Sequence, residues 1–373
     1  MDRSGSGEFR DGGGAGMSAL ATVIITPHFD EPSDDRAMAA RAIAAAWSSE
    51  GIRTTVICPE TALSPALRSG AMLEIQRVEL PRGEDASFCV RAMIDTWHRE
   101  RRRSLAAIHC VDDARSVIAA KFASMAGLVS APVVHVRVGA AADEREAAAD
   151  ALADGVMVFA EPFANREDAA LMSMPTLPRL WRAPAASRVF AIPTTVAEAR
   201  HRDIAAALAA SGATAQGWSI AASGPNGRWI LADAAASSAD GSEGECVTII
   251  TDGPVFPAVA LQSVGRGGLA IVHAESPLAS ALPSWLRDQI VYSDVASLAS
   301  VMRRVATATA AGRGVWQQAL AGALVVSASS FVQQSRRVWR ELRRTRDTDA
   351  VARMWKLIEC QAEPGPLLLE TSR

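Results

Sequence analysis

The organisation of the chain is clearest in residues 247–304, which read VTIITDGPVFPAVALQSVGRGGLAIVHAESPLASALPSWLRDQIVYSDVASLASVMRR. This stretch begins with a short apolar run that is typical of a buried strand, and a loop rich in proline and glycine follows. A helix, a second buried strand, a loop and a third strand come next, and Asp294 is placed to open a final helix. The alternation predicts βαβ units with parallel strands.

The same alternation extends outward from this stretch. From Ala19 onward, short apolar runs alternate with longer alanine-rich segments, which is typical of a mostly parallel, doubly wound sheet. The strands predicted for this first series are residues 20–26, 52–58, 75–80, 106–109, 133–138 and 156–160. A proline-rich connection at 174–187 ends the series, and a second one begins with a strand at 189–192 and a helix at 196–210. We therefore predict an α/β protein with two Rossmann-like domains.

Composition narrows the class of protein. The 373 residues are 49% hydrophobic and 21% charged, which is enough apolar material for two domains with their own cores. A formal net charge of −3 does not indicate a nucleic-acid-binding protein. Five scattered cysteines without a CxxC pair favour a reducing cytosol over a disulfide framework or a structural zinc site. Without a signal-peptide pattern or a run of about 18 apolar residues, we expect a cytoplasmic protein, and peripheral contact with the inner membrane face is the alternative.

Residues 247–304 resemble the nucleotide-sugar half of retaining glycosyltransferases of the GT-B fold, family 4. The positions that match the family pattern are Phe256-Pro257, Gly267-Gly268, residues 269–272, Asp294 and Leu298-Ala299. Pro254 and Gln262 stand where the family has two glutamates, one near the donor sugar and one on the ribose hydroxyls. Gln262 can still hydrogen-bond a hydroxyl as a neutral partner.

The N-terminal half carries the resemblance in two strands. Residues 108–112 are similar to the family strand that ends in vHaHD, and residues 132–139 are similar to its PvVvTvHG strand. His109 matches, whereas Val138 replaces the histidine that faces the donor sugar in the family. Arg137 is the polar residue nearest to that lost histidine, although side chains alternate along a strand. The resemblance thus points to His109 and Arg137 as catalytic candidates.

In the C-terminal half, residues 217–225 are similar to a family strand that ends in a Gly-Pro turn, and this places Gly224 at the ligand. The helix at 201–208 aligns so that Arg200 takes the place of the lysine that binds the diphosphate, while Thr195 replaces the arginine. Arg200 can neutralise a departing diphosphate or be a solvated helix-start residue. His273 and Glu275 follow the buried strand 269–272 and can contact the donor or cap the next turn.

The resemblance implies two Rossmann-like domains that face one another across a cleft, where a nucleotide-sugar binds. Residues 1–16 are expected to be a disordered tail, 17–180 the acceptor-side domain and 181–345 the nucleotide-sugar domain, while residues 346–373 are expected to contain a helix that returns to the N-terminal domain. If active, the chain is a retaining, metal-independent glycosyltransferase that uses a nucleotide-sugar as its donor substrate and needs no cofactor. Its acceptor is not identified by the sequence.

Two alternatives remain open because both glutamates, two histidines and one arginine of the family pattern are replaced. One is a catalytically inactive GT-B homologue that serves as partner or scaffold of an active glycosyltransferase. The other is an unrelated two-domain α/β protein that binds sugars or acts as an epimerase.

Three further motifs stand out, and two of them permit two interpretations. The loop at 27–32, PHFDEP, is similar to the metal-binding motif of sugar N-deacetylases, but a polar turn in which Asp30 or Asp34 caps the next helix is the alternative. The basic run HRERRR at 98–103 closes a helix, where cations favour the macrodipole. The run RRVWRELRRTR at 336–346 fits either a solvated helix with Trp339 in the core or a helix at an anionic bilayer.

Overall fold

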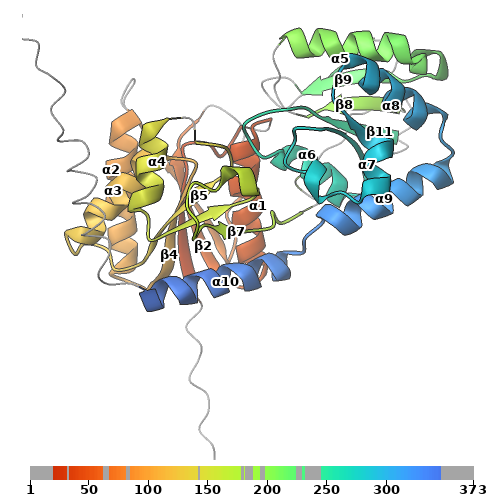
Figure 1. The fold of residues 1–373 in the computed structure, drawn as a ribbon. Helices are drawn as coiled ribbons and strands as arrows, with labels where there is room; N and C mark the ends of the chain where they lie inside the picture. Colours follow the sequence, from red (N-terminus) through yellow and green to blue (C-terminus); the bar gives the residue numbers. More distant parts are fainter. Residues whose placement is uncertain are drawn as a thin grey trace, which may run out of the picture.

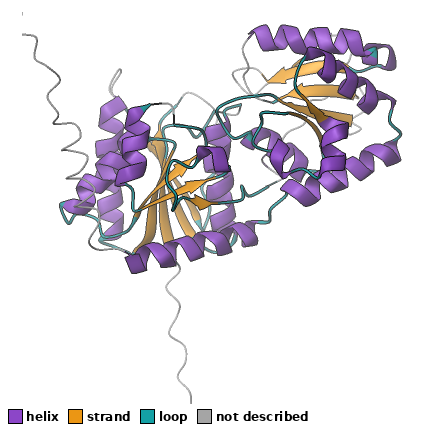
Figure 2. Cartoon of the chain, in the orientation of Figure 1, coloured by secondary structure: helices purple, strands orange, loops and turns teal. Residues whose placement is uncertain are grey.

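The computed structural model describes residues 20–345, except for 32, 62–66, 81–84, 142, 178–179, 181–187, 194–197, 224–228 and 232–244. In these residues the chain forms two separate sheets, each with helices on both of its faces (Figures 1 and 2). The predicted fold class, an α/β protein with two Rossmann-like domains, is confirmed. The chain passes from one sheet to the other between Leu171 and Arg188.

The first sheet has the strand order β3-β2-β1-β4-β5-β6-β7, and all neighbouring strands are parallel. Its strands are β1 (Ala21–Ile25), β2 (Arg53–Pro59), β3 (Leu73–Val78), β4 (Leu105–Val111), β5 (Val133–Arg137), β6 (Gly155–Val158) and β7 (Ala170–Leu171). The central strands β1, β4 and β5 are buried along their whole length, as expected for continuous apolar runs covered by helices on both faces.

The second sheet has the order β10-β9-β8-β11-β12-β13, in which only β10 is antiparallel to its neighbour. Its strands are β8 (Arg188–Ile192), β9 (Ser219–Ser223), β10 (Trp229–Leu231), β11 (Glu245–Ile250), β12 (Leu269–His273) and β13 (Val291–Tyr292). β8, β11, β12 and β13 are therefore adjacent, and their carboxyl ends lie along one edge of this sheet.

Side-chain caps account for several helix starts. The helices are α1 (Asp35–Ser49), α2 (Asp85–Glu100), α3 (Ala114–Met125), α4 (Glu144–Leu152), α5 (Glu198–Ser211), α6 (Ala258–Gly265), α7 (Ser284–Ile290), α8 (Val295–Thr307), α9 (Ala310–Leu324) and α10 (Ala328–Thr345). Asp34 accepts a hydrogen bond from Ala37 N at 2.8 Å and so caps α1. Asp294 and Ser297 form a reciprocal capping box on α8, which confirms the predicted start of that helix.

The helix that returns to the N-terminal domain is α10, which crosses below the first sheet in Figure 1. Trp339 of α10 donates from Nε1 to His109 Nε2 at 2.9 Å, and Trp47 of α1 donates to Ser335 Oγ at 3.1 Å. The expected domain boundary at 345 is therefore too late, because α10 belongs to the N-terminal domain by its packing. The expected tail, 1–16, and the expected returning segment, 346–373, lie outside the described residues.

The stretch Ala310–Thr345 has the length and mean apolarity of a membrane-spanning helix, with a mean hydropathy of 1.3 over its best window. The chain leaves the helical conformation at 325–327, however, and this break separates α9 from α10. α9 packs on α6 and β12 of the second domain, whereas α10 packs on α1 of the first. The stretch therefore links the two domains.

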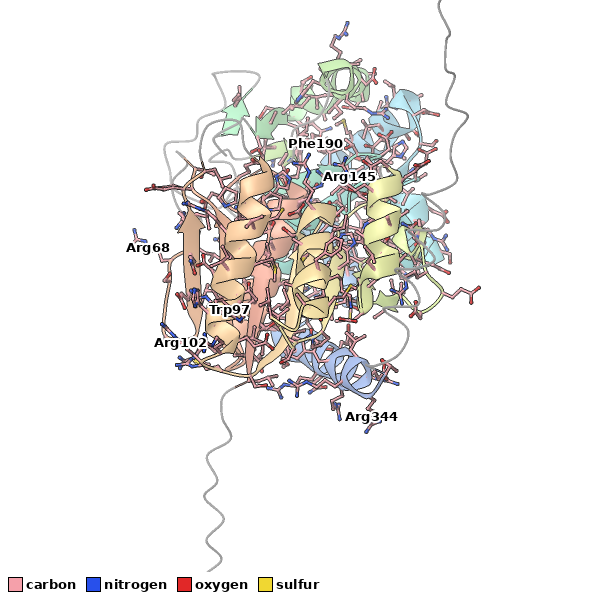
Figure 3. All side chains as sticks on the ribbon, turned by 90° about the vertical axis from the view of Figure 1, so that its left-hand side faces the viewer. Arg68, Trp97, Arg102, Arg145, Phe190 and Arg344 are labelled. Carbon is pink, nitrogen blue, oxygen red and sulfur yellow. The ribbon has the colours of Figure 1, made fainter. Side chains whose placement is uncertain are left out.

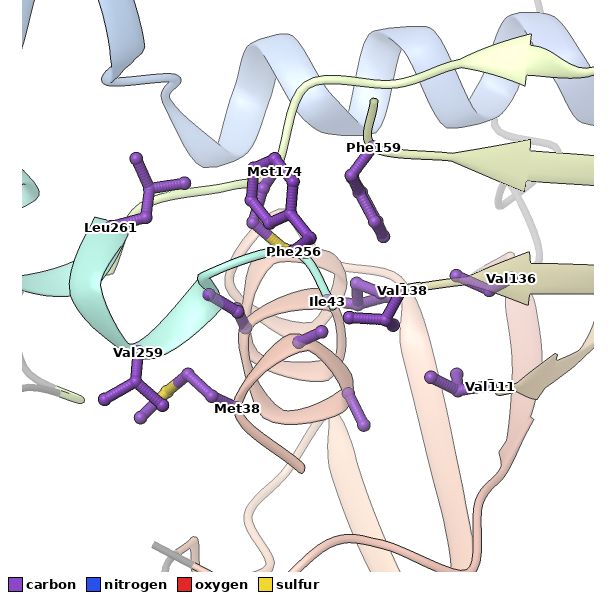
Figure 4. Close-up of a cluster of buried hydrophobic side chains, with 14 of the residues drawn as sticks. Met38, Ile43, Val111, Val136, Val138, Phe159, Met174, Phe256, Val259 and Leu261 are labelled. Carbon is purple, nitrogen blue, oxygen red and sulfur yellow. The ribbon is translucent and has the colours of Figure 1, made fainter. Parts of the chain in front are cut away.

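The two domains are joined by a buried apolar contact around α6. Figure 4 shows Val259 of α6 beside Met38 of α1, and Phe256 beside Phe159 and Met174. The rings of Phe159 and Phe256 have centroids 5.8 Å apart. Four of these five side chains are at most 4% exposed, and Phe159 is 6% exposed. Burial of this apolar surface favours one fixed arrangement of the domains.

Candidate functional site

Polar side chains gather where four parallel strands of the second sheet end. Arg200 lies in the first turn of α5, which follows β8, and Asp252 lies just after β11. His273 and Tyr292 are the last residues of β12 and β13. Open α/β sheets bind their ligands at this edge because the βα loops of neighbouring strands meet there. This edge is therefore the candidate site.

Arg200 is the cation of the site, and its side chain is 41% exposed. Its Nη2 forms an ion pair with Asp252 Oδ2, and its Nη1 lies 3.9 Å from Asp203 Oδ2. Oδ1 of Asp252 is buried and has no hydrogen-bond partner in the described part of the chain. A phosphate can reach Arg200, but it must share the guanidinium with Asp252 or displace this carboxylate, and either event weakens the binding of anions.

His273 and Tyr292 form the neutral part of the site. Their rings meet edge to face with centroids 5.0 Å apart, and the Tyr292 hydroxyl donates to Ile250 O at 3.2 Å. Burial raises the pKa of Tyr292, so its hydroxyl stays protonated at neutral pH. Glu275 N donates to His273 Nδ1 at 3.2 Å, so Nε2 carries the proton of the neutral imidazole and is a donor. The Glu275 side chain is exposed beside it.

Arg137, proposed from the sequence as a catalytic candidate, is completely buried in the first domain. Its Nη1 binds Asp150 Oδ2 at 2.9 Å, its Nη2 donates to Gly139 O at 2.8 Å, and Glu146 and Asp112 lie 3.4 and 3.9 Å away. Its charge is therefore already neutralised by carboxylates, and we assign it a structural role in place of the catalytic one.

Asp150 shows how strongly this buried network is coupled. Burial alone raises the pKa of its carboxyl, but the hydrogen bond and charge of His135 and the charge of Arg137 outweigh burial and hold the pKa below its ordinary value. His135 Nδ1 lies 2.6 Å from Asp150 Oδ1. The carboxylate form of Asp150 is thus part of the folded core.

His109, the other catalytic candidate, is also fully buried. Its Nε2 accepts the Trp339 hydrogen bond, so Nδ1 carries the proton and lies 3.0 Å from Thr22 Oγ1, which in turn donates to Ala107 O at 3.0 Å. Burial lowers the pKa of His109 to about 3, which keeps the ring neutral. Nε2 therefore ties β4 to α10, and Nδ1 ties β4 to β1, so we assign this histidine to the core.

Gln262 connects α6 to the chain that leads into the second domain. Its Oε1 accepts from Leu177 N at 2.6 Å, and its Nε2 donates to Pro175 O at 3.2 Å. The side chain is 0% exposed, so these two contacts account for its polar atoms. The ribose contact expected for Gln262 is therefore replaced by a structural one.

The first domain directly occupies the start of α6. Asp35 Oδ1 accepts a hydrogen bond from Val259 N at 2.7 Å, so a carboxyl group of α1 lies where the N-terminus of α6 offers its donors. Burial, offset in part by this bond, raises the pKa of Asp35 to about 8. A carboxyl group of the protein itself thus takes the position that an anionic ligand would use.

Main-chain pairing closes the space beside Asp35. Phe256 N donates to Val138 O at 2.6 Å, and Ala140 N donates to Pro254 O at 2.8 Å. A Cβ added at Gly139 would lie 2.7 Å from Pro254 O, so only glycine permits this approach. Val138 and Pro254, which the sequence comparison places opposite sugar-facing side chains, lie in a backbone contact between the domains.

The loop that was compared with a metal motif folds as a polar turn. Asp30 is 2% exposed and binds Arg77, with Oδ1 at 2.9 Å from Nη2, and Asp34 caps α1. Ligand atoms of His28, Glu31 and Asp34 do lie within 4.8 Å of one another. Because Asp30 is paired with an arginine and Asp34 with a helix start, we assign no metal to this loop.

The structure thus brings together Arg200 and His273, with Glu275 beside them, and it leaves His109, Arg137 and Gln262 elsewhere in the core. Gly224 and Thr195 lie outside the described residues. Asp252 and Tyr292 were missed in the sequence, although each directly follows or ends a predicted strand of the second series. Polar residues at strand ends are the signal that points to them.

No family model and no curated relative matches the sequence. Among solved structures, the chain is similar to HepE from Anabaena in complex with UDP and glucose, with a TM-score of 0.57, 10% identity and coverage of 86% of this chain and 99% of that one. It is also similar to the lipopolysaccharide outer core galactosyltransferase WaaB, with a TM-score of 0.52, 11% identity and coverage of 85% and 99%. WaaG, a glycosyltransferase involved in lipopolysaccharide biosynthesis, is similar with a TM-score of 0.52 and 10% identity. The match covers 85% of this chain and 99% of that one. The chain therefore has the GT-B fold of these glycosyltransferases.

Proposed function

We propose that the chain is a glycosyltransferase-like protein, related to family 4, that binds a nucleotide-linked sugar at the carboxyl edge of its second sheet. The observation that carries this proposal is the convergence of Arg200, His273 and Tyr292 from separate βα units on that edge. The fold shared with HepE, which was crystallised with UDP and glucose, supports it. We propose a cytoplasmic location, with peripheral contact at the inner membrane face as the alternative.

In this proposal each residue has a defined role. Arg200 contacts the diphosphate, because a guanidinium supplies both charge and N–H donors. His273 Nε2–H and the exposed Glu275 carboxylate contact hydroxyls of the sugar or ribose. Gly224, which directly follows β9, lets the ligand approach the backbone. Transfer to an acceptor then proceeds with retention and without a metal or cofactor.

A second candidate function is that of an inactive GT-B homologue that acts as partner or scaffold of an active glycosyltransferase. Two observations favour it: Asp35 occupies the start of α6, and Val138 and Phe256 are paired through their backbones. Electrostatic stabilisation of the leaving group supplies much of the rate in such enzymes, and loss of one donor typically costs a factor of about a hundred or more. A donor such as Val259 N, which already binds the carboxyl group of Asp35, cannot contribute to it.

Calorimetric titration with nucleoside diphosphates, UDP included, tests the site. We expect binding in the micromolar range or weaker, and Arg200→Ala should reduce the affinity by roughly tenfold or more, as for the loss of a charged hydrogen bond. Arg202→Ala is the matched control, because Arg202 is an exposed arginine two residues further along the same helix. Unchanged binding in Arg200→Ala would refute this site.

Release of nucleoside diphosphate from nucleotide-sugars separates the two functions. Turnover by the isolated chain that is lost in Arg200→Ala supports a transferase. Binding of the nucleotide without turnover, both alone and with sugar acceptors added, supports the inactive homologue.

A further inference from the structure

A polar cavity lies in the first domain, at the opposite edge of the sheet from the domain contact. It has a volume of about 520 Å³ and opens where β1, β2 and β4 begin, against the last turn of α2. Figure 3 shows Arg102 at this end of the domain, the same end at which Arg344 of α10 lies. A cavity of this size falls in the range of small-molecule sites, about 300–1,000 Å³.

Arginines dominate the charge of this cavity. Four arginines face two carboxylates in its wall: Arg53, Arg99, Arg102, Arg103, Glu74 and Asp95. Arg99, Arg102 and Arg103 come from one turn, because Arg102 N and Arg103 N both donate to Arg99 O at 3.0 Å. Residues three and four apart in a helical turn share one face, so the three guanidinium groups extend to the same side.

The carboxylates are already engaged. Glu74 forms a two-pronged bond with Arg99, in which both N–O distances are 2.7 Å, and Asp95 Oδ2 accepts from Gln76 Nε2 at 2.5 Å. The hydrogen bond from Arg99, followed by the charges of Arg99, Arg103 and Arg53, holds the pKa of Glu74 below its ordinary value. The cavity therefore keeps an excess of positive charge that its own acids do not balance.

Several donors in the wall have no partner in the described part of the chain. Arg53, Arg102 and Arg103 form no ion pair there, and the Nε atoms of Arg53 and Arg99 are buried without a hydrogen-bond acceptor. A buried unsatisfied donor is costly unless a ligand or water accepts its proton. The helix macrodipole explains why cations end α2, but it explains neither the cavity nor the buried Nε donors.

A second basic helix end borders the same cavity. Arg343 Nη2 of α10 donates to Leu105 O at 3.1 Å, and Leu105 is part of the cavity wall. The last turn of α10 thus meets the basic end of α2 at this cavity. A cluster of guanidinium groups suits a phosphate ligand, because each guanidinium can donate two parallel hydrogen bonds to phosphate oxygens.

We propose that this cavity is a binding site for a phosphate-bearing ligand, separate from the candidate site at the second sheet. Arg53, Arg102 and Arg103 contact the phosphate oxygens, and Glu74 holds Arg99 in place in the wall. The phosphate belongs either to a soluble phosphorylated metabolite or to the headgroup of an anionic lipid, since both present the same oxygens. Of the two, the free phosphate compound can enter the cavity completely.

The test uses the full chain with Arg200→Ala as background, so that pyrophosphate bound at the second domain does not contribute. Titration with inorganic pyrophosphate should show binding, and Arg102→Glu combined with Arg103→Glu should weaken it at least about tenfold. Both arginines are exposed, so the fold is retained, which circular dichroism checks. Arg53→Gln is a second variant without charge reversal and should also weaken binding.

The matched control is Arg336→Glu combined with Arg337→Glu, which changes the net charge equally at two exposed positions of α10. The pyrophosphate affinity of this control should stay within about twofold of the Arg200→Ala background, because salt screens the effect of exposed charges outside the cavity.

Co-sedimentation with vesicles of phosphatidylcholine, with and without phosphatidic acid, distinguishes a lipid headgroup from a soluble phosphate compound. Binding to phosphatidic acid alone, lost in the Arg102/Arg103 variant, identifies a lipid headgroup. No binding of either probe, or equal binding by the Arg102/Arg103 variant and the control, overturns the proposal.

Discussion

Each domain contains one arginine and one histidine that the sequence marks as candidates, and the two arginines lie in opposite surroundings. Arg137 and His109 of the first domain are 0% exposed; Asp150 binds the arginine and Trp339 binds the histidine. Arg200 of the second domain is 41% exposed, whereas His273 is 6% exposed and lies at the end of a strand. Residue type and strand position do not distinguish the two pairs. Accessibility does, because Arg200 is paired with Asp252 yet keeps 41% of its side chain exposed, whereas a ligand cannot reach the buried Arg137.

The largest effect that tests this comparison comes from Arg137→Ala. It removes the partner of Asp150 in a buried network, and removal of one member of a buried ion pair typically costs about 3–5 kcal/mol. Urea denaturation should show this loss in the free energy of unfolding. A loss below about 1 kcal/mol, the range of a surface pair, would show that Arg137 is not structural.

Asp35→Asn tests the contact between the two regions through its pH dependence. Since the pKa of Asp35 is about 8 in the folded chain and 3.8 ordinarily, the folded state keeps a proton that the unfolded state has lost between these values. The stability of the protein should therefore fall as pH rises from about 4 to 8, at no more than about 1.4 kcal/mol per pH unit from this group. Asparagine still accepts from Val259 N and should flatten that slope, as measured by denaturation at several pH values. An unchanged slope in the variant would remove Asp35 as its cause.

Trp339→Phe sharpens the contrast between the two histidines. The variant keeps an aromatic ring on α10 but leaves His109 Nε2 buried without its donor, which should cost about 1–3 kcal/mol of unfolding free energy. Trp285→Phe on α7 is the control, because Trp285 is 47% exposed, and it should change stability little. Equal losses in the two variants would show that the bond to His109 contributes nothing.

The smallest effect on stability is expected for Arg200→Ala. Its pair with Asp252 is partly exposed, and such pairs contribute about 0–1 kcal/mol. The same variant should nevertheless lose nucleotide affinity. If Arg200→Ala lost as much stability as Arg137→Ala and kept its nucleotide affinity, Arg200 would have a structural role like that of Arg137 and would not bind the ligand.

The sequence by itself determined the order of strands and helices and hence the fold. Buried parallel strands read as continuous apolar runs, and caps such as Asp294 mark helix starts locally, so neither needs knowledge of distant contacts. The strand ends that carry Arg200 and His273 could be placed for the same reason. The expected domain boundary failed at α10, because only tertiary contacts such as the bonds of Trp339 to His109 and of Trp47 to Ser335 show which domain that helix covers.

Only the tertiary structure decided which candidates are available to a ligand. Arg137 meets Asp150 across thirteen positions of sequence, Gln262 meets the chain around Leu177, and Asp35 meets Val259 from the other domain. No local pattern records these partners, since each contact forms when separate elements pack. The burial that packing creates then sets the charge state and the free donors of each side chain, and these properties separate a core residue from a site residue.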